Sequence, residues 1–296
     1  IAEDCMRQFY QGVYDWVGTP GQTINSFTDF AKGPERLDFK SVPQGMRNAA
    51  LSPADHWAVV GSQTSLLNDR LVGSAYKNGS LGNIGGLDTY MSHVMPTHTV
   101  GALGGTPVIN GATQEVSYDT AKDSWSQTLN VDGWSNSVTG VLKAGDVFTI
   151  DDVYMVNTKT KAATNILQQF VVTADADSNG SGETALTISP PIIITGPHQT
   201  CSASPADGAG VNVVGTAATG YIQNLHYHKN AFACAMVPME MPQAAYNGSR
   251  QTYKNMSVRV IPTYNGDTDV SAWRLDVLYG RKLIDPRLAT RVSGTA

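Results

Sequence analysis

The chain has 296 residues, of which 15% are charged and 41% hydrophobic, and its formal net charge at pH 7 is −5. Strong direct binding of nucleic acid needs clustered Lys and Arg to neutralise phosphates, and this acidic chain has no such cluster. It also has no run of eighteen apolar residues, so the sequence predicts no membrane-spanning helix and no membrane partner.

The composition favours a β-rich protein. Its charged fraction lies below the roughly 25% that is usual for soluble chains, and it contains 29 Gly and 14 Pro. A weakly charged surface is easy to desolvate, which suits a protein covered by neighbours, although an ordinary β-rich protein fits equally well. Three widely spaced cysteines, Cys5, Cys201 and Cys234, form neither a disulfide framework nor a metal-binding spacing. They predict reduced thiols and synthesis in a cytosol.

At the start of the chain, apolar residues recur every three to four positions and predict one helix over residues 1–17. They are Ile1, Cys5 or Met6, Phe9, Val13 and Trp16. The run from Gly18 to Gly21 stops this helix, and no capping signal precedes it.

Two further helix starts follow. Ser26 with Asp29 three residues later predicts a capped short helix, broken at Gly33 and Pro34. Ser52, followed by Pro53, predicts a second capped helix. Its inward-facing residues are expected to be Trp57, Val59 and Val60.

Residues 66–75 are expected to form a loop and a short helix. A glycine-rich stretch at residues 78–86 then opens into a predicted strand over residues 87–96, which ends at Pro96.

From residue 99 to about residue 224, helical periodicity gives way to recurrent turn residues and short β-branched or aromatic runs. The runs cover residues 147–156, 166–173 and 185–194. Several short strands at this spacing predict a small barrel or sandwich.

Two alternating runs close the chain. Residues 255–261 and 272–279 are predicted to pair as antiparallel strands across a connection that contains Asn265 and Gly266. One face of the second strand carries Trp273, Leu275, Val277 and Tyr279, so we expect that face to be buried.

Several motifs in this order resemble the major capsid proteins of tailed bacteriophages. They are KAGDVFTIDDVYMVN at residues 143–157, HKNAF at 228–232, RLDVLYG at 274–280 and DPRLA at 285–289. More narrowly, the chain is similar to coat proteins of short-tailed phages, whose Hong Kong 97-type fold carries an inserted β-barrel.

This resemblance implies an α+β chain with the Hong Kong 97-type capsid fold, built from axial and peripheral domains and an inserted all-β barrel. Residues 1–17 would end the long spine helix of the peripheral domain, and residues 18–98 would form the axial domain. The barrel would span residues 99–224, residues 225–252 would return to the axial domain, and residues 253–296 would supply peripheral strands and a tail. In this family an arm, an extended loop and most of the spine helix precede such a start, so we expect the sequence to lack its natural amino-terminal part.

The implied function is self-assembly into the icosahedral shell of a phage virion, made in the bacterial cytoplasm. The implied partners are other copies in pentamers and hexamers, a scaffolding protein, a portal protein and packaged double-stranded DNA bound without sequence specificity. The inserted barrel would stabilise the subunit, bridge neighbouring capsomers or seat a decoration protein, and these three roles stay open. We predict structural or intersubunit ion pairs among six residues near the carboxyl end: Arg274, Asp276, Arg281, Asp285, Arg287 and Arg291.

The sequence contains no complete motif for catalysis, for a cofactor or for a metal. Asp175 to Gly180 match the start of a calcium loop, but the twelfth position is Leu186 instead of an acid. His226 and His228 lack further ligands at zinc spacing, with only His198 and Cys234 nearby in sequence. We therefore predict no enzyme activity.

Two other classes of protein stay open. A secreted β-rich adhesin or carbohydrate-binding module would suit the Thr, Gly and Asn content and the four Asn-x-Ser sequons, at Asn78, Asn179, Asn247 and Asn255. A hydrolase would need a catalytic domain near residues 1–96. The host, the triangulation number and the role of the barrel cannot be predicted from the sequence.

Overall fold

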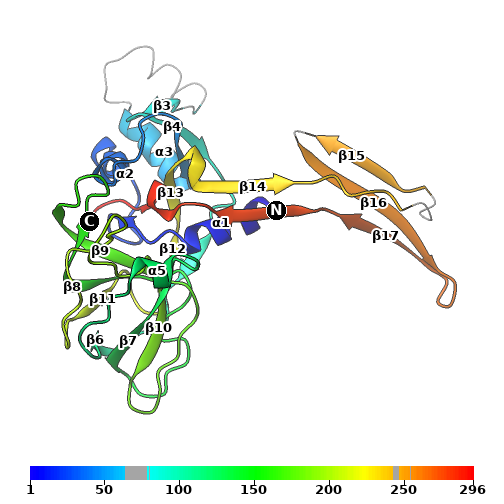
Figure 1. The fold of residues 1–296 in the computed structure, drawn as a ribbon. Coiled ribbons are helices and arrows are strands. Elements are labelled where there is room, and N and C mark those ends of the chain that lie inside the picture. Colours follow the sequence, from blue (N-terminus) through cyan, green and yellow to red (C-terminus); the bar gives the residue numbers. More distant parts are fainter. Residues whose placement is uncertain (64–78, 80, 243–246, 254) are drawn as a thin grey trace. The chain divides into compact units, whose positions relative to one another are not determined.

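The computed structural model describes residues 1–63, 79, 81–242, 247–253 and 255–296. The fold is α+β, mostly sheets with few helices, and the chain divides into two compact units (Figure 1). Unit 1 comprises Ile1–Ala231 and Asp285–Ala296, and unit 2 comprises Phe232–Ile284. None of the described helices is long and apolar enough to cross a membrane.

A six-stranded sheet, here called the base sheet, organises the first part of unit 1. Its strand order is β1-β19-β13-β2-β4-β3. The strands are β1 (Trp16–Val17), β19 (Ala289–Val292), β13 (Asn224–His228), β2 (Arg47–Leu51), β4 (Leu87–Met91) and β3 (Asn83–Ile84). Strand β13 pairs antiparallel with both β19 and β2, so strands from the two ends of the chain meet in one sheet.

Residues 1–17 do not form one helix, so that prediction was wrong. Helix α1 (Ala2–Gln11) ends at its C-cap Gly12, and β1 then pairs in parallel with β19, aligning Trp16 with Arg291. Trp16 is buried. In the extended conformation, residues 16 and 17 pair with strand β19 and the Trp16 ring is buried. These tertiary interactions stabilise the chain more than continuation of the local helix would.

Helix α2 (Phe27–Phe39) begins as predicted, because the Ser26 side chain accepts a hydrogen bond from the Asp29 amide. It continues through Gly33 and Pro34, so the predicted break was wrong. A proline inside a helix costs about 3 kcal/mol. Burial of Phe30, Gly33, Pro34 and Leu37 within unit 1 offsets this cost.

Helix α3 (Pro53–Gln63) confirms the predicted start, with the Ser52 hydroxyl accepting from the Asp55 amide at 3.2 Å. Val59 and Val60 are buried as expected, whereas Trp57 is 55% exposed, so its predicted inward position was wrong. Trp57 lies on the side of the helix away from the core that contains Val59. The predicted loop and short helix at residues 66–75 lie outside the described residues.

The predicted strand over residues 87–96 ends earlier than expected. Strand β4 stops at Met91, and a separate strand, β5 (Thr97–Thr99), begins just after Pro96. Strand β5 pairs antiparallel with β12 (Gly220–Ile222). Along the chain, β5 directly precedes the strands of the barrel described next, and β12 directly follows them.

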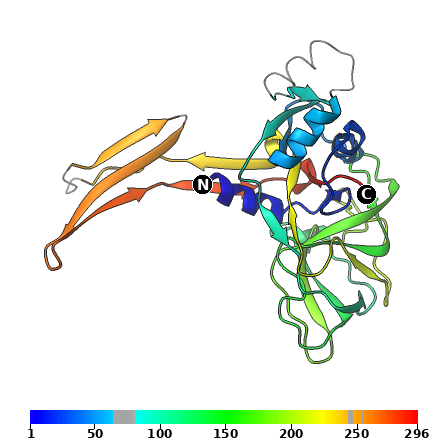
Figure 2. The same ribbon diagram turned by 180° about the vertical axis from the view of Figure 1, so that it is seen from behind.

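The second part of unit 1 is a nearly closed β-barrel, seen from both sides in Figures 1 and 2. Its strand order is β11-β8-β9-β10-β7-β6, and a bridge between Val108 and Gly210 links the two edges. The strands are β6 (Gly105–Ile109), β7 (Gln127–Trp134), β8 (Val147–Val156), β9 (Ala163–Val172), β10 (Thr184–Ser189) and β11 (Val211–Val213), with a short helix α5 (Tyr118–Ala121).

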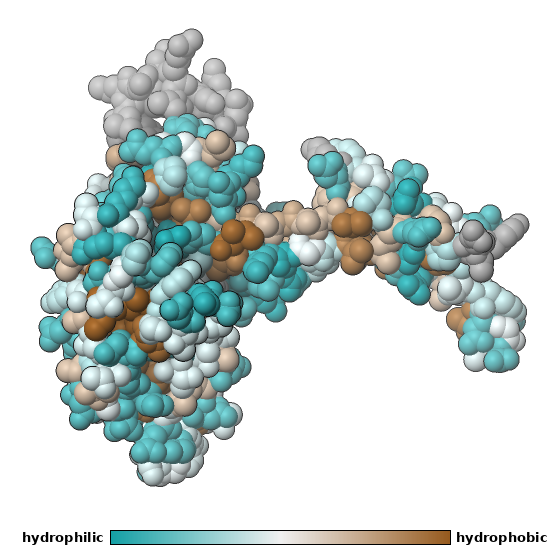
Figure 3. Space-filling model, in the orientation of Figure 1, coloured by the Kyte–Doolittle hydropathy of each residue, from teal (hydrophilic) through white to brown (hydrophobic). Residues whose placement is uncertain are grey.

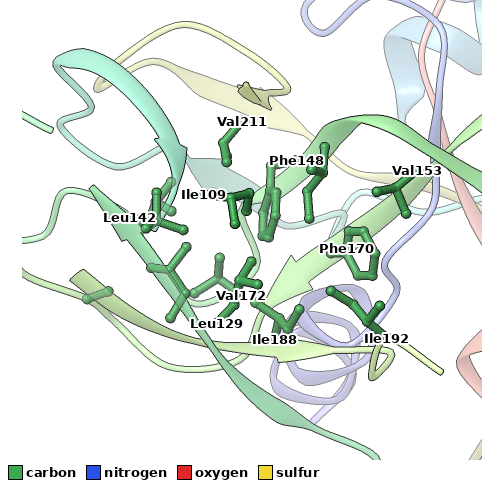
Figure 4. Packing of buried hydrophobic residues seen from close by; sticks show 14 of the residues in the cluster. Ile109, Leu129, Leu142, Phe148, Val153, Phe170, Val172, Ile188, Ile192 and Val211 are labelled. Atoms are coloured by element: carbon green, nitrogen blue, oxygen red, sulfur yellow. The ribbon is translucent and has the colours of Figure 1, made fainter. Parts of the chain in front are cut away.

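Alternate residues of these strands fill the barrel, as Figure 4 shows. Phe148 and Phe170 stack at the centre with ring centroids 5.7 Å apart. The prediction of a strand over residues 147–156 is confirmed, and those over 166–173 and 185–194 overlap β9 and β10. The prediction had no strand corresponding to β7, although β7 is the strand between β6 and β10.

Unit 2 contains two small antiparallel sheets. Strand β14 (Phe232–Met236) pairs with β18 (Tyr279–Leu283). The other sheet joins β15 (Ser249–Tyr253), β16 (Met256–Asn265) and β17 (Val270–Asp276), which confirms that the two closing runs pair as antiparallel strands. The second run was expected to continue to residue 279, which was wrong, because β17 stops at Asp276 and Tyr279 begins β18. Short 3-10 turns at Lys229–Ala231 (η1) and Pro286–Leu288 (η2) belong to unit 1.

Candidate assembly surfaces

The three-stranded sheet of unit 2 has one strongly apolar face. The register places Val260 opposite Leu275 and Pro262 opposite Trp273, so these side chains share one side of the sheet. We call this side the apolar face. Its apolar members are Tyr253, Met256, Val258, Val260, Pro262, Tyr264, Trp273 and Leu275, and the same register adds Ser249, Gln251 and Ser271 on the two outer strands.

The apolar face is open. Trp273 and Leu275 are each 68% exposed, and Tyr253 and Tyr264 are exposed to a similar degree. Figure 3 shows hydrophobic residues at the surface of unit 2 between hydrophilic ones. The predicted burial of this face was wrong, because none of the described residues covers it. Contiguous exposed apolar surface on a soluble chain marks an interaction site.

The opposite face of the same sheet, here called the polar face, carries paired charged groups beside the buried Ile261. The Arg259 guanidinium donates to Asp276 at 2.5 and 3.1 Å and to the Glu240 carbonyl at 2.5 Å. Arg250 donates to the Met239 carbonyl at 3.0 Å, so the segment before β15 lies along this side.

Two of the six predicted contact residues meet on this polar face. The Arg274 Nε donates to Asp276 Oδ1 at 2.7 Å. Hydrogen bonds from Arg274 and Arg259 lower the pKa of the Asp276 carboxyl. Arg274 stays largely exposed, whereas its partner Asp276 is shared with the buried Arg259.

Three more of the six residues make local contacts. Arg281 on β18 places its guanidinium carbon 5.9 Å from the centroid of the Tyr279 ring. Asp285 caps η2 by accepting from the Arg287 amide at 3.0 Å, and it pairs with the Arg287 guanidinium at 2.8 Å.

The sixth residue, Arg291, lies inside unit 1 and is only 1% exposed. Its Nη1 donates to the Gly145 carbonyl at 2.8 Å, and its guanidinium carbon lies 5.3 Å from the Tyr10 ring and 5.6 Å from the Trp16 ring. Burial lowers its pKa to about 9. Arg291 therefore links β19, helix α1 and the barrel turn that contains Gly145.

The same barrel turn carries a buried side-chain contact that the sequence did not reveal. His98 Nε2 lies 2.7 Å from Asp146 Oδ1, and the Tyr10 hydroxyl lies 3.3 Å from His98 Nδ1. The other Asp146 oxygen accepts from the amides of Gly101 and Lys143. The turn sequence itself signalled Asp146, whereas no spacing connected it to His98.

A third polar contact completes the seam between the barrel and the base sheet. The Gln169 side chain accepts from the Trp16 amide at 2.5 Å and donates to the Trp16 carbonyl at 2.9 Å, so it acts as a ladder partner for strand β1. We call these contacts, together with those of Arg291 and His98, the barrel–base seam. An isolated Gln in a strand gives no sequence signal for such a role.

The residues of the two candidate metal motifs, the calcium-like loop and the histidine pair, make other contacts. Asp175 and Asp177 accept hydrogen bonds from the Ala144 and Gly140 amides, and Asn179 accepts from the Ser181 and Glu183 amides. His226 packs on Phe30. No group of three His, Cys, Asp or Glu side chains within the described part of the chain is placed to hold a metal ion.

Comparison with known proteins identifies the family. Residues 13–292 match the family model described as P22 coat protein, gene protein 5. The chain belongs to this family of phage coat proteins.

The sequence of one relative agrees with the family match. The chain is 26% identical over 289 residues to the major capsid protein of Acyrthosiphon pisum secondary endosymbiont phage 1, covering 94% of this chain and 68% of that protein. Among solved structures, the CUS-3 coat protein I-domain is 27% identical and matches over 38% of this chain and 96% of that domain, with a TM-score of 0.27.

The coat protein is thus a major capsid protein, which forms the shell of a bacteriophage virion. It is a structural protein and not an enzyme, and the family does not favour a secreted adhesin. For such a protein the functional sites are the surfaces that meet other subunits and the contacts that fix the shape of each subunit.

Proposed function

We propose that the chain is the subunit of an icosahedral shell with the Hong Kong 97-type fold, in which residues 99–224 form a barrel inserted into the axial domain. Strands β5 and β12 support this division, because they align Thr99 with Gly220 where the barrel begins and ends. An insert whose ends are adjacent leaves its host fold intact. Residues 18–98 and 225–252 would then be axial, and residues 1–17 and 253–296 peripheral.

The apolar face of unit 2 is the observation that carries the proposal. A three-stranded sheet with an open apolar face gains about 25 cal/mol for each Å² that becomes covered. In a shell, every subunit is surrounded by others, so such a face is buried when the shell closes. Non-identical contact surfaces between neighbours generate closed rings, and pentamers and hexamers would result here.

The contacts between subunits can be weak individually. A millimolar contact contributes only about 4 kcal/mol, but several made at once give a cooperative shell. Arg274, Asp276 and Arg281, which lie in unit 2, are the proposed intersubunit ion-pair residues. Asp285, Arg287 and Arg291, which belong to unit 1, are proposed to have structural roles within the subunit.

Further partners are proposed from the kind of shell. They are a scaffolding protein during assembly, a portal protein at one vertex, a decoration protein and packaged double-stranded DNA. The net charge of −5 supports contact with DNA that is neither tight nor sequence-specific.

Negative-stain microscopy and sedimentation of the purified chain test the proposal. We expect the chain to form shells or rings, and we expect Trp273→Glu to leave it as folded, unassembled subunits. A chain that stays monomeric under all assembly conditions, or a variant that assembles as well as the parent, contradicts the proposal.

A further inference from the structure

A narrow cavity of about 50 Å³ lies in unit 1, beside the barrel–base seam. Its walls come from both parts: Tyr14, Lys40 and Arg287 precede or follow base strands, whereas Gln168 belongs to barrel strand β9. A cavity of this volume holds a few water molecules. It is too small for a nucleotide or a cofactor and admits one small polar group, so any stem attached to that group would lie at the opening of the cavity, beside the half-buried Trp125.

The charges around the cavity are cationic. Lys40, Lys161 and Arg287 line it, and no Asp or Glu does among the described residues. Two of the cations have acids of their own, because Lys40 pairs with Asp15 at 3.0 Å and Arg287 pairs with Asp285 at 2.8 Å. Lys161 has no paired acid in the described part of the chain, so the cavity keeps an excess of positive charge.

Two buried polar side chains that border the cavity, Tyr14 and Gln168, each have a hydrogen-bond donor without a partner among the described residues. Tyr14 is only 6% exposed, the Lys40 ammonium lies 4.7 Å above its ring, and its hydroxyl bonds to none of the described residues. Burial raises the pKa of this hydroxyl, so it keeps its proton and can donate. Gln168 is buried as well, and its amide donates to the Gln169 carbonyl at 2.7 Å, which uses one of its two N–H bonds.

We propose that this cavity binds a carboxylate carried on a short apolar stem. The Tyr14 hydroxyl and the second N–H of Gln168 would donate to the carboxylate, and Lys161 would supply the unpaired charge. The indole of Trp125, which also lines the cavity, offers an apolar surface to the stem. Hydrogen bonds to an ionised group are the stronger kind, so the ionised acid is favoured over its neutral amide.

An occupant would contact the base and the barrel at the same time. A ligand that binds only the folded, docked arrangement stabilises that arrangement in proportion to its concentration. The site would therefore brace the barrel on the base sheet. This role concerns single subunits and does not depend on shell formation.

Calorimetric titration of the full chain tests the site with three probes: phenylacetate, phenylacetamide and inorganic phosphate. We expect saturable one-to-one binding of phenylacetate with a millimolar dissociation constant. Phenylacetamide lacks the charge and phosphate lacks the stem, so each should bind about tenfold more weakly. Equal binding of the acid and the amide, equal binding of phosphate, or no saturable binding of phenylacetate overturns the proposal.

Three variants assign the binding to this cavity. Lys161→Gln and Tyr14→Phe should each weaken phenylacetate binding about tenfold. The matched control is Lys159→Gln, two residues away in the same turn and exposed, which should leave the affinity within about twofold. Urea midpoints that match the parent show that the variants are folded. If Lys161→Gln and Lys159→Gln behave alike, the cavity is not the binding site.

Discussion

The barrel of unit 1 and the three-stranded sheet of unit 2 have the same alternating sequence pattern, but the apolar residues are buried in the barrel and exposed in the sheet. In the barrel, Phe148 and Phe170 face inward and are fully buried. In the sheet, Trp273 and Leu275 form an equally regular apolar row and are two-thirds exposed. Period-two alternation specifies which residues share a face, whereas burial depends on what packs against that face. In a shell-forming protein, the second kind of face is available for assembly.

The largest effect on the folded chain is expected from the barrel core. Phe148→Ala removes a fully buried ring that stacks on Phe170, so the free energy of unfolding should fall by about 4 kcal/mol. Urea unfolding of the unassembled chain measures this loss. Tyr264→Ala, on the apolar face, is the matched aromatic substitution and should leave the urea midpoint of unit 1 unchanged. An equal loss of unfolding free energy in both variants would contradict the claim that only the barrel residues form a core of the folded subunit.

The barrel–base seam should be sensitive to the loss of Arg291. Arg291→Ala leaves a cavity and removes the donor to the Gly145 carbonyl, so it should destabilise unit 1 by about 3 kcal/mol.

Arg291→Met is the informative companion variant. It keeps most of the buried volume, and the Arg291 Nε and Nη2 atoms have no hydrogen-bond partner among the described residues. Replacing an imperfectly paired buried ion with an apolar side chain can be nearly neutral, so this variant should lie within about 1 kcal/mol of the parent. If Met is as harmful as Ala, the charge itself is required.

A pH-dependent contribution to stability should come from His226. This side chain is fully buried, neither ring nitrogen has a partner among the described residues, and burial lowers its pKa to about 3. The unfolded chain therefore binds a proton that the folded chain rejects between about pH 6.5 and pH 3. The contribution is complete above pH 6.5 and falls as the pH drops, by up to about 1.4 kcal/mol for each pH unit.

Urea midpoints measured from pH 7.5 to pH 4.5 test this contribution. In His226→Leu the corresponding part of the slope should vanish, because no titratable group remains at the site. The exposed His198, mutated to Leu, serves as the control, because this variant keeps the buried His226 and the part of the slope that His226 contributes. An unchanged slope in His226→Leu would contradict the expected titration.

The smallest effect on folding is expected from the exposed ion pair of unit 2. Arg274 is largely exposed and shares Asp276 with the buried Arg259, so Arg274→Gln should leave the urea midpoint unchanged. Its effect should instead appear in the rate or the salt dependence of assembly, since rim charges steer encounters. Assembly that is insensitive to Arg274→Gln at every salt concentration would remove this residue from the intersubunit contacts.

Local signals predicted much of this fold, and tertiary contacts explain where they failed. The caps at Ser26 and Ser52 were predicted because each needs only a side chain and an amide three residues away. The continuation of α2 through Gly33 and Pro34 was not predicted. Gly33 packs so closely on His226 that a Cβ atom would come within 1.9 Å of the ring, and no local pattern carries that contact.

The candidate sites show the same division. The pairing of β16 with β17 and the presence of Arg274 beside Asp276 followed from strand alternation. The partnership of His98 with Asp146 joins residues 48 positions apart, and that of Gln169 with Trp16 joins residues 153 positions apart. Such pairs depend on how the barrel docks, which single-sequence periodicity does not encode.

The most direct test of the central claim compares two introduced charges in assembly reactions followed by sedimentation and negative-stain microscopy. Trp273→Glu places a carboxylate on the apolar face of unit 2, and Thr128→Glu places one on the exposed side of barrel strand β7. We predict that both variants keep the parent unfolding profile and that only Trp273→Glu fails to form shells. Normal shells from Trp273→Glu would contradict the claim that the apolar face is buried on assembly.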